Sequence, residues 1–422
     1  MTRASERNRP AIPVRGPWLL TTAWVVVVLL LAGCSEREGE PHAPGMSVQD
    51  SLGILIVENS SPAQPDGDFW ELSPAPTVEI GSTDEADPAL LFSQIRSMDR
   101  QTDGSIVVVD GLSNEVRIFD RSGRHLSTSG GSGTGPGEFT MANLIVGLPG
   151  DSILVHDQIL ARLSLFRPDG THERTEQLTG LPGFSPFMTP LGLAPDGALV
   201  VRGVHEPPPP RFGPGLVEAT TYLADLDEGR MDALAGVPFA LGATDEQGQP
   251  RPVFPMAVPI QAVSPGGLWV TVPPEPEIKK IGWSGSVERI VRFPEARLAL
   301  TSEEQRGVVA WQRARLTAAQ LDGAPEPVVL PSLPAFLHLV SDREGYLWVQ
   351  ESSDDRDPDD WEFGAPRGSA VWRVLSPEGE WLGSVRMPDR FRPMAIGTDW
   401  VLGVKTDDLD VEFVRLYGLS RN

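Results

Sequence analysis

Three residue types are scarce in this chain, and each scarcity excludes a kind of site. The 422 residues include one cysteine, Cys34, so neither an internal disulfide nor a cysteine-based metal site can form. Only three lysines occur, and none follows a glycine-rich loop, which excludes a phosphate-binding loop of the Walker type. The six histidines are scattered and form no His-Glu-x-x-His pair, so a zinc site is not expected.

Positive charge is scarce as well. The formal net charge is −23 at pH 7. A surface this acidic repels phosphate backbones and anionic lipid headgroups. We therefore expect no nucleic-acid partner.

The N-terminal segment has the features of a signal peptide. Four arginines precede an apolar run over residues 18–31, which is too short to span a bilayer comfortably. The run ends in Leu-Ala-Gly-Cys, which resembles the lipobox of bacterial lipoproteins. The resemblance implies that residues 1–33 are removed and that Cys34 is lipidated, and Ser35 in place of Asp implies the outer membrane of the cell envelope. An ordinary secretory signal is the alternative, and residues 34–50 are expected to form a flexible tether.

A strand pattern recurs six times in residues 51–422, and each copy is a turn residue followed by an apolar run. The copies are DGSIVVVD (from 103), GDSILVHD (150), DGALVVRG (196), GGLWVTV (266), EGYLWVQE (344) and GTDWVLGV (397). A second, alternating strand that runs into a hairpin turn follows each copy. A unit of about 47 residues with four short strands is typical of a β-propeller blade.

The glycine-rich stretch GGSGTGPGEF, residues 130–139, lies between two such units. It lacks the helix that a dinucleotide-binding loop requires, and the order GGSGTGPGEF…GDSILVHD…ARLSLFRPDG resembles the NHL repeat. That resemblance implies an all-β fold, a six-bladed β-propeller of four-stranded antiparallel blades. Phe139 is expected to pack between blades, and residues 76–80 to close the last blade as its missing outer strand. The strand-like residues 53–59 are a candidate to extend the same sheet.

The large insertions are all expected on one face. If the strands are named a to d from the axis outward, the b–c and d–a connections lie on the same side. The b–c insertions 205–219 and 352–368 fall there, as do residues 130–139 and the stretch 294–334, which contains a helix at about 301–316. Because elaborated loops on a rigid scaffold usually carry function, the candidate binding residues are Arg211, Phe212, Trp361 and Glu138.

Three carboxylates end b strands on this same face: Asp110, Asp157 and Glu351. The propeller resembles those of gluconolactonases and paraoxonases, which hold calcium in the channel and act on lactones or esters. One hypothesis is therefore a calcium-dependent hydrolase or lyase, which requires these carboxylates to converge on one ion. The favoured hypothesis is a binding propeller without cofactor or catalytic residues that recognises a glycan, peptide or protein. A third is a structural subunit of an envelope complex.

Overall fold

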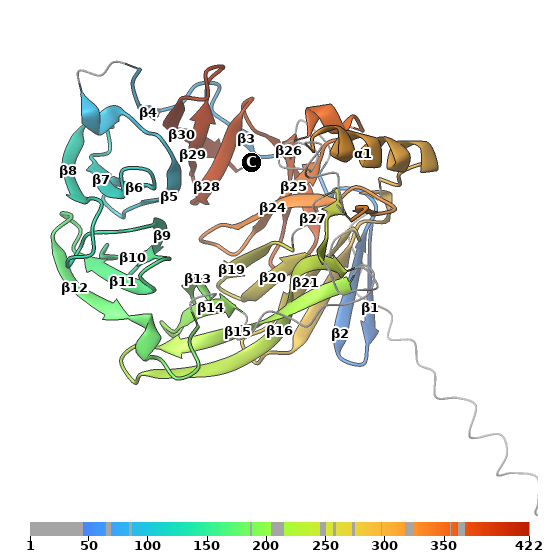
Figure 1. Cartoon of the computed structure of the whole chain (residues 1–422), viewed down its shortest axis with the longest axis horizontal. Helices are drawn as coiled ribbons and strands as arrows, with labels where there is room; N and C mark the ends of the chain where they lie inside the picture. The colour runs from blue at the N-terminus through green and yellow to red at the C-terminus, as the bar shows by residue number, and fades with distance from the viewer. Residues whose placement is uncertain are drawn as a thin grey trace, which may run out of the picture. The chain divides into compact units, whose positions relative to one another are not determined.

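Six β-sheets surround a common axis in the computed structural model, within the unit Ala43–Asn422 (Figure 1). Each of the six repeats identified in the sequence forms one sheet, so the predicted six-bladed propeller of four-stranded antiparallel blades is confirmed. The structure describes residues 45–64, 69–83, 87–185, 188–203, 215–244, 250–255, 259–271, 275–296, 298–316, 325–354, 356–361 and 368–421.

The strands of each blade follow the chain from the axis outward. Blade one contains β5 (Ile95–Arg100), β6 (Ile106–Asp110), β7 (Glu115–Phe119) and β8 (His125–Gly130). Blade two contains β9 (Ala142–Gly147), β10 (Ile153–Asp157), β11 (Arg162–Phe166) and β12 (His172–Gln177). Blade three contains β13 (Thr189–Leu193), β14 (Leu199–Gly203), β15 (Gly215–Asp225) and β16 (Arg230–Thr244), and β17 (Pro250–Arg251) extends it.

Of the remaining blades, four and six also use strands from the N-terminal end of the chain. Blade four contains β19 (Gln261–Ser264), β20 (Gly267–Thr271), β21 (Glu277–Ile281) and β22 (Val287–Arg292), followed outward by β2 (Ile54–Asn59) and β1 (Met46–Ser51). Blade five contains β24 (Phe336–Ser341), β25 (Leu347–Ser352), β26 (Gly368–Leu375) and β27 (Trp381–Arg386). Blade six contains β28 (Phe391–Ile396), β29 (Trp400–Thr406) and β30 (Glu412–Ser420), with β3 (Glu71–Leu72) and β4 (Val78–Ile80) on its outer edge.

The elements outside the blades are short. They are the helix α1 (Ser302–Ala314), the parallel pair β18 (Val253–Phe254) and β23 (Val328–Val329), and the single-turn helices η1 (Pro88–Leu90), η2 (Leu178–Gly180), η3 (Pro294–Ala296) and η4 (Pro358–Asp360). Thr301 and Glu304 form the predicted capping box at the start of α1. None of the helices in the described part of the chain is long and apolar enough to cross a bilayer.

The N-terminal strands close one blade and enlarge another. β4 pairs antiparallel with β30, so the predicted closure of blade six is confirmed. The expectation that residues 53–59 extend that sheet is wrong, because β2 pairs in parallel with β22 of blade four. Val57 of β2 is fully buried against the apolar side chains of blade four, which accounts for this pairing. β1 begins at Met46, so the strand starts inside the stretch that the sequence predicts as a tether.

Phenylalanine side chains fill the gaps between blades. Phe139 is fully buried between β6 and β7 of blade one and β10 of blade two, as the sequence predicts. Phe92 packs between blades six and one, and Phe293 between blades four and five. Each inner strand contacts the inner strand of the next blade, and β28 contacts β5, so the ring is complete.

Candidate functional site

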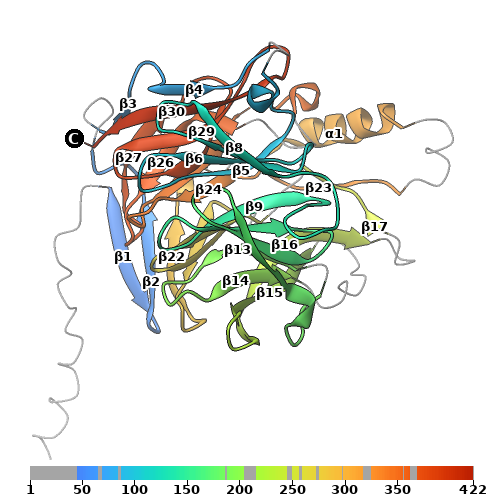
Figure 2. The ribbon, with the colours of Figure 1, turned by 90° about the vertical axis from the view of Figure 1, so that its left-hand side faces the viewer.

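The b–c and d–a connections lie on one side of the blades, which we call the loop-rich face. The helix α1 and strands β17 and β23 project from this side (Figure 2). The predicted binding residues Arg211 and Phe212 lie outside the described residues.

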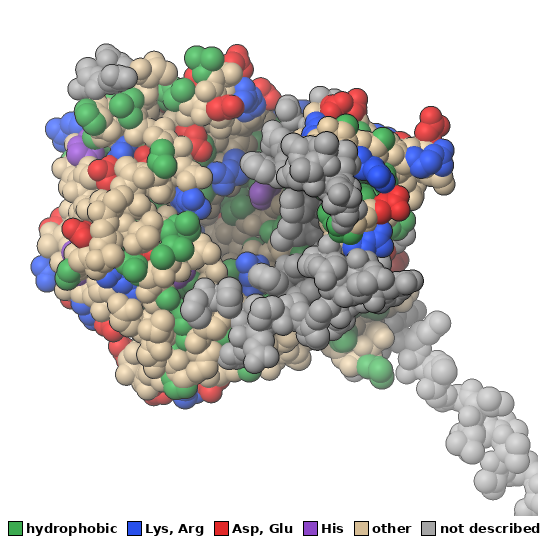
Figure 3. Space-filling model, in the orientation of Figure 1, with side chains coloured by type: hydrophobic (Ala, Val, Ile, Leu, Met, Phe, Trp, Pro, Cys, Tyr) green, Lys and Arg blue, Asp and Glu red, His purple; other side chains and the backbone are tan. Residues whose placement is uncertain are grey.

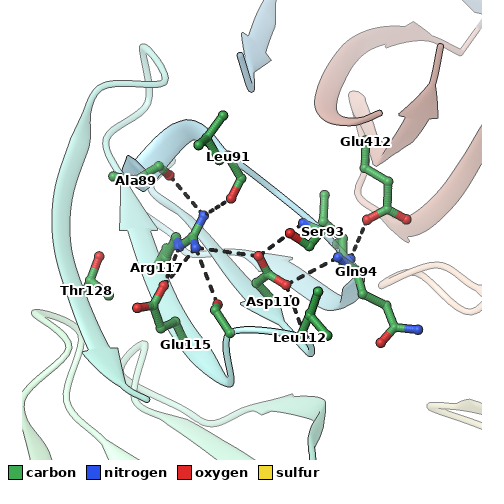
Figure 4. A network of polar contacts seen from close by, with 12 residues as sticks. Ala89, Leu91, Ser93, Gln94, Asp110, Leu112, Glu115, Arg117, Thr128 and Glu412 are labelled. Atoms are coloured by element: carbon green, nitrogen blue, oxygen red, sulfur yellow. Dashed lines mark hydrogen bonds and ion pairs between the residues drawn. The ribbon is translucent and has the colours of Figure 1, made fainter. Parts of the chain in front are cut away.

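The Asp110 side chain is bound within blade one. Its carboxylate accepts hydrogen bonds from the backbone N–H groups of Ser93 (3.2 Å), Gln94 (3.3 Å) and Leu112 (3.1 Å), and it lies 3.5 Å from the Arg117 guanidinium (Figure 4). The side chain therefore joins the segment before β5 to the turn after β6. Because Asp110 is 1% exposed, these bonds satisfy a charge that would otherwise be costly to bury.

Asp157 repeats this arrangement in blade two. It accepts hydrogen bonds from the N–H groups of Thr140 (2.7 Å), Met141 (3.3 Å), Ile159 (3.0 Å) and Leu160 (3.0 Å). The first two residues precede or begin the inner strand, and the last two form the b–c turn. The carboxylate is thus a fixed part of the blade.

Glu351 is held by an arginine of its own blade. It forms an ion pair with Arg373, which also pairs with Glu295 at 2.9 Å and lies over the Phe293 ring at 4.7 Å. Arg373 stands opposite Val349 in β25, the register position that Arg117 occupies in blade one opposite Val108.

The structure does not bring the three carboxylates together, so the convergent calcium site considered from the sequence is not formed by Asp110, Asp157 and Glu351. The physical reason is that their oxygens are occupied by backbone N–H groups and arginines of their own blades. Across the residues that the structure describes, no group of three or more His, Cys, Asp and Glu side chains is arranged to hold a metal ion.

The glycine-rich loop is held from below by Arg162. The guanidinium of Arg162 donates to the carbonyl oxygens of Thr134 (3.0 Å), Gly135 (2.9 Å) and Glu138 (2.7 Å). The exposed Glu138 side chain accepts a hydrogen bond from the Gly135 N–H at 2.8 Å. Gly137 has φ +75°, and a side chain there would also meet the His172 ring. The loop is an ordered turn that presents Glu138 on the face while anchoring Phe139.

Trp361 is buried, but not in a blade. It is 7% exposed and lies 6.1 Å from Trp311 of α1, between ring centroids. The four elements α1, β18, β23 and η4 come from three different insertions, and we call them together the cap. Their shared apolar core contains Leu300, Val308, Leu333 and Trp361, with Phe254, Leu298 and Val329 packed against it.

Ion pairs also join the cap segments. Arg356 pairs with Glu304 of the helix at 3.1 Å, and Arg315 pairs with Asp359 at 2.9 Å. Trp361 is therefore a packing residue of the cap. One of the two interpretations of the sequence, an exposed binding residue on a loop, is therefore not what the structure shows for Trp361.

Three exposed apolar side chains mark the other part of the face. Leu112, Ile159 and Leu409 are 67%, 58% and 83% exposed, and they lie in the b–c connections of blades one, two and six. These blades are neighbours in the ring. The described residues include only two other exposed large hydrophobic side chains, Leu52 and Leu126, neither of which lies in a b–c connection. We call the first three side chains the apolar tips.

The centre of the loop-rich face is a hollow with Lys or Arg and His side chains around it (Figure 3). His338 of β24 and Arg392 of β28 belong to neighbouring inner strands. Both are solvent-exposed, yet desolvation by the surrounding protein lowers the pKa of His338 to about 4 and lowers the pKa of Arg392. Exposure to water combined with desolvation is the expected state of side chains inside an open hollow. Arg392 also lowers the pKa of His338 by charge repulsion.

Two more polar residues lie near the starts of inner strands, as Arg392 does. Arg96 of β5 and Asn143 of β9 are the extra residues of β-bulges, which redirect side chains away from the regular pleat. Asn143 accepts from His156 Nδ1 at 2.8 Å and donates to Gln158 at 3.1 Å. Sequence reasoning missed these residues because it followed the b and c strands. Aligning the inner strands of the six repeats would have shown Arg96, Asn143 and Arg392 near their starts.

The fold is a six-bladed β-propeller whose loop-rich face carries the large insertions. Residues 87–183 match the DUF5128 family, described as a 6-bladed beta-propeller. No protein of curated function matches the sequence.

Solved structures show the same fold. A member of the DUF4221 family from Bacteroides vulgatus is similar with a TM-score of 0.51 at 12% identity, over 84% of this chain and 99% of that chain. A protein from Bacteroides fragilis described as exported has a TM-score of 0.45 at 12% identity, over 87% and 99% of the two chains. A gluconolactonase from Xanthomonas campestris has a TM-score of 0.41 at 13% identity, over 83% and 100%. At these identities the similarity shows the fold alone.

Proposed function

We propose that this chain is a lipid-anchored, extracytoplasmic binding propeller that recognises a glycan, peptide or protein through its loop-rich face. The observation that carries the proposal is the set of apolar tips, Leu112, Ile159 and Leu409, on three consecutive blades of that face. Exposed apolar side chains that cluster on one side commonly mark an interaction surface. The hollow at the axis and the cap lie on the same side of the ring as these side chains (Figure 2, Figure 3).

The binding proposal is tested by removing the apolar tips. The triple variant Leu112→Ser, Ile159→Ser, Leu409→Ser is compared with the double variant Leu52→Ser, Leu126→Ser on a glycan array and in pull-downs from detergent-solubilised envelopes. We expect ligands of the parent to be lost by the triple variant and kept by the double variant, because Leu52 and Leu126 lie in the β1–β2 turn and in β8. Both variants should keep the stability of the parent within about 1 kcal/mol, since exposed positions contribute little to stability. Equal loss in both variants, or full retention by the triple variant, contradicts the proposal.

The membrane anchor is tested separately at Cys34. Stable anchoring requires more than one acyl chain, and a lipidated N-terminal cysteine would supply the site for them. We expect Cys34→Ser to stay uncleaved or to be released as a soluble protein, as measured by fractionation and by the mass of the N-terminus. Ser35→Thr is the control for a change beside the cleavage site. Membrane fractionation and processing identical to the parent would contradict lipid anchoring.

A further inference from the structure

We propose that the hollow at the axis of the loop-rich face binds an oxyanion, a carboxylate or phosphate group of the ligand, through Arg392 and Arg96 with His338 beside them. The inference rests on the proposed function, because it specifies the chemistry of the ligand that the face recognises. It goes further by placing the charged group of that ligand at three consecutive inner strands, β24, β28 and β5.

The three residues lie on consecutive inner strands of the ring. β28 contacts β24 on one side and β5 on the other. Arg392 acts electrostatically on His338, and Glu412 acts on Arg392. Glu412 in turn accepts a hydrogen bond from the Ile95 N–H at 2.5 Å, next to Arg96 in the chain (Figure 4). Interacting charges therefore extend from His338 of blade five to Arg392 and Glu412 of blade six, and the Glu412 hydrogen bond reaches the residue that precedes Arg96 in blade one.

Within the part of the chain that the structure describes, neither arginine forms an ion pair. Two other arginines near blade ends are neutralised at short range, Arg117 by Glu115 at 2.7 Å and Arg373 by Glu295 at 2.9 Å. Arg96 instead donates to the neutral Gln94 at 2.8 Å, and no carboxylate of the described residues forms an ion pair with Arg96 or Arg392.

The nearby acids have hydrogen-bond partners of their own, although Glu412 still acts electrostatically on Arg392. Asp110 binds three backbone N–H groups and Arg117, and Glu412 is fixed on the Ile95 N–H. The chain has a net charge of −23, so a group of arginines without ion pairs among the described residues makes the axis locally positive on an otherwise acidic protein. Desolvated guanidinium groups gain most from a bidentate oxyanion, which supplies both charge and hydrogen-bond acceptors.

The test measures binding of citrate and of inorganic phosphate to the full chain by isothermal titration calorimetry, with chloride as the background ion. We expect 1:1 binding of at least one probe, and a loss of at least about tenfold in affinity for each of Arg392→Gln and Arg96→Gln, which corresponds to 1.4 kcal/mol per lost contact. Arg392→Lys should give an intermediate loss, because it keeps the charge without the fork geometry. Arg124→Gln, on an exposed arginine paired with Asp120, is the control with the same change of net charge.

The outcomes separate the sources of the oxyanion. Binding of citrate alone assigns a carboxylate ligand, and binding of phosphate alone assigns a phosphate or phosphoryl ligand. The proposal is overturned if neither probe binds, or if Arg392→Gln and Arg96→Gln bind as tightly as Arg124→Gln while their circular dichroism and thermal midpoints match those of the parent. In that case the apolar-tip variant still tests the binding function independently, since its readout does not depend on the oxyanion.

Discussion

Blades six, one and two, the regular half of the propeller, differ from blades three, four and five, the elaborated half. In the regular half the b–c connections are short turns, and carboxylates such as Asp110 and Asp157 hold them to the inner strands. In the elaborated half the b–c connections of blades three and five and the d–a connections before and after blade four are long. Three of these long connections combine into the cap, with its own apolar core around Trp361. The same strand framework therefore supports two kinds of loop.

The difference shows which packing stabilises the ring and which packing stabilises only the cap. The regular half buries Phe92 and Phe139 between blades, so its packing belongs to the ring. The cap buries Trp361 and Val308 against other insertions, so its packing is local. The axial hollow and the apolar tips are carried by the strands and turns of the ring. The cap lies on the same face and has a separate apolar core.

The largest expected effects come from removing one aromatic side chain from each half. Phe139→Ala should lower the free energy of unfolding of the whole propeller by about 3–5 kcal/mol, because a fully buried ring leaves a cavity between two blades. Trp361→Ala should change global unfolding by less than about 1 kcal/mol, but it should strongly increase hydrogen exchange of the α1 amides, since only the cap loses its core. Urea unfolding and hydrogen exchange by mass spectrometry measure the two effects.

Conservative variants serve as controls for this pair. Phe139→Leu and Trp361→Phe keep most of the apolar volume, and each should show less than half of the effect of its alanine variant. If Trp361→Ala lowers the global midpoint as much as Phe139→Ala does, the cap and the ring form one cooperative unit and the division into two halves is wrong.

Much of the fold could be predicted from the sequence because it is encoded locally. Each blade repeats a turn followed by a buried b strand, and the loop before a blade ends in an aromatic residue such as Phe139. β4 could be placed because residues 76–80 imitate the last strand of a blade. β2 could not be placed, because its parallel pairing with β22 joins residues more than two hundred positions apart and leaves no local pattern.

The site was less predictable for three physical reasons. An acid at a strand end can bind a metal or bind backbone N–H groups, and only the positions of those N–H groups, as at Asp157, decide between the two. A tryptophan in a long insertion is buried or exposed according to what the other insertions do, and Trp361 meets two of them. The axial residues Arg392 and His338 lie in inner strands, which carry no conspicuous turn before the apolar run.

A smaller effect is expected from acid, and it again separates the two halves. His156 in blade two is 1% exposed, and burial lowers its pKa to about 4, although Asp157 raises it in part. Its Nδ1 lies 2.8 Å from Asn143 Oδ1, so Nδ1 carries the proton of the neutral ring. No described residue hydrogen-bonds to its buried Nε2, so protonation there would bury an N–H group without an acceptor.

The sign of the pH dependence follows from these pKa values. Unfolded histidine has an ordinary pKa near 6.5, so between about pH 6.5 and pH 4 the unfolded chain binds more protons than the folded chain. The stability linked to His156 is fully present above pH 6.5 and is lost as the pH falls toward 4, by at most about 3 kcal/mol.

We expect His156→Gln to remove this part of the slope of unfolding free energy against pH. His338→Gln, in the elaborated half, should change the slope much less, because water reaches that side chain in the hollow. A larger change of slope from His338→Gln than from His156→Gln would show that the axial hollow, and not the interior of the regular half, controls the acid sensitivity of the fold.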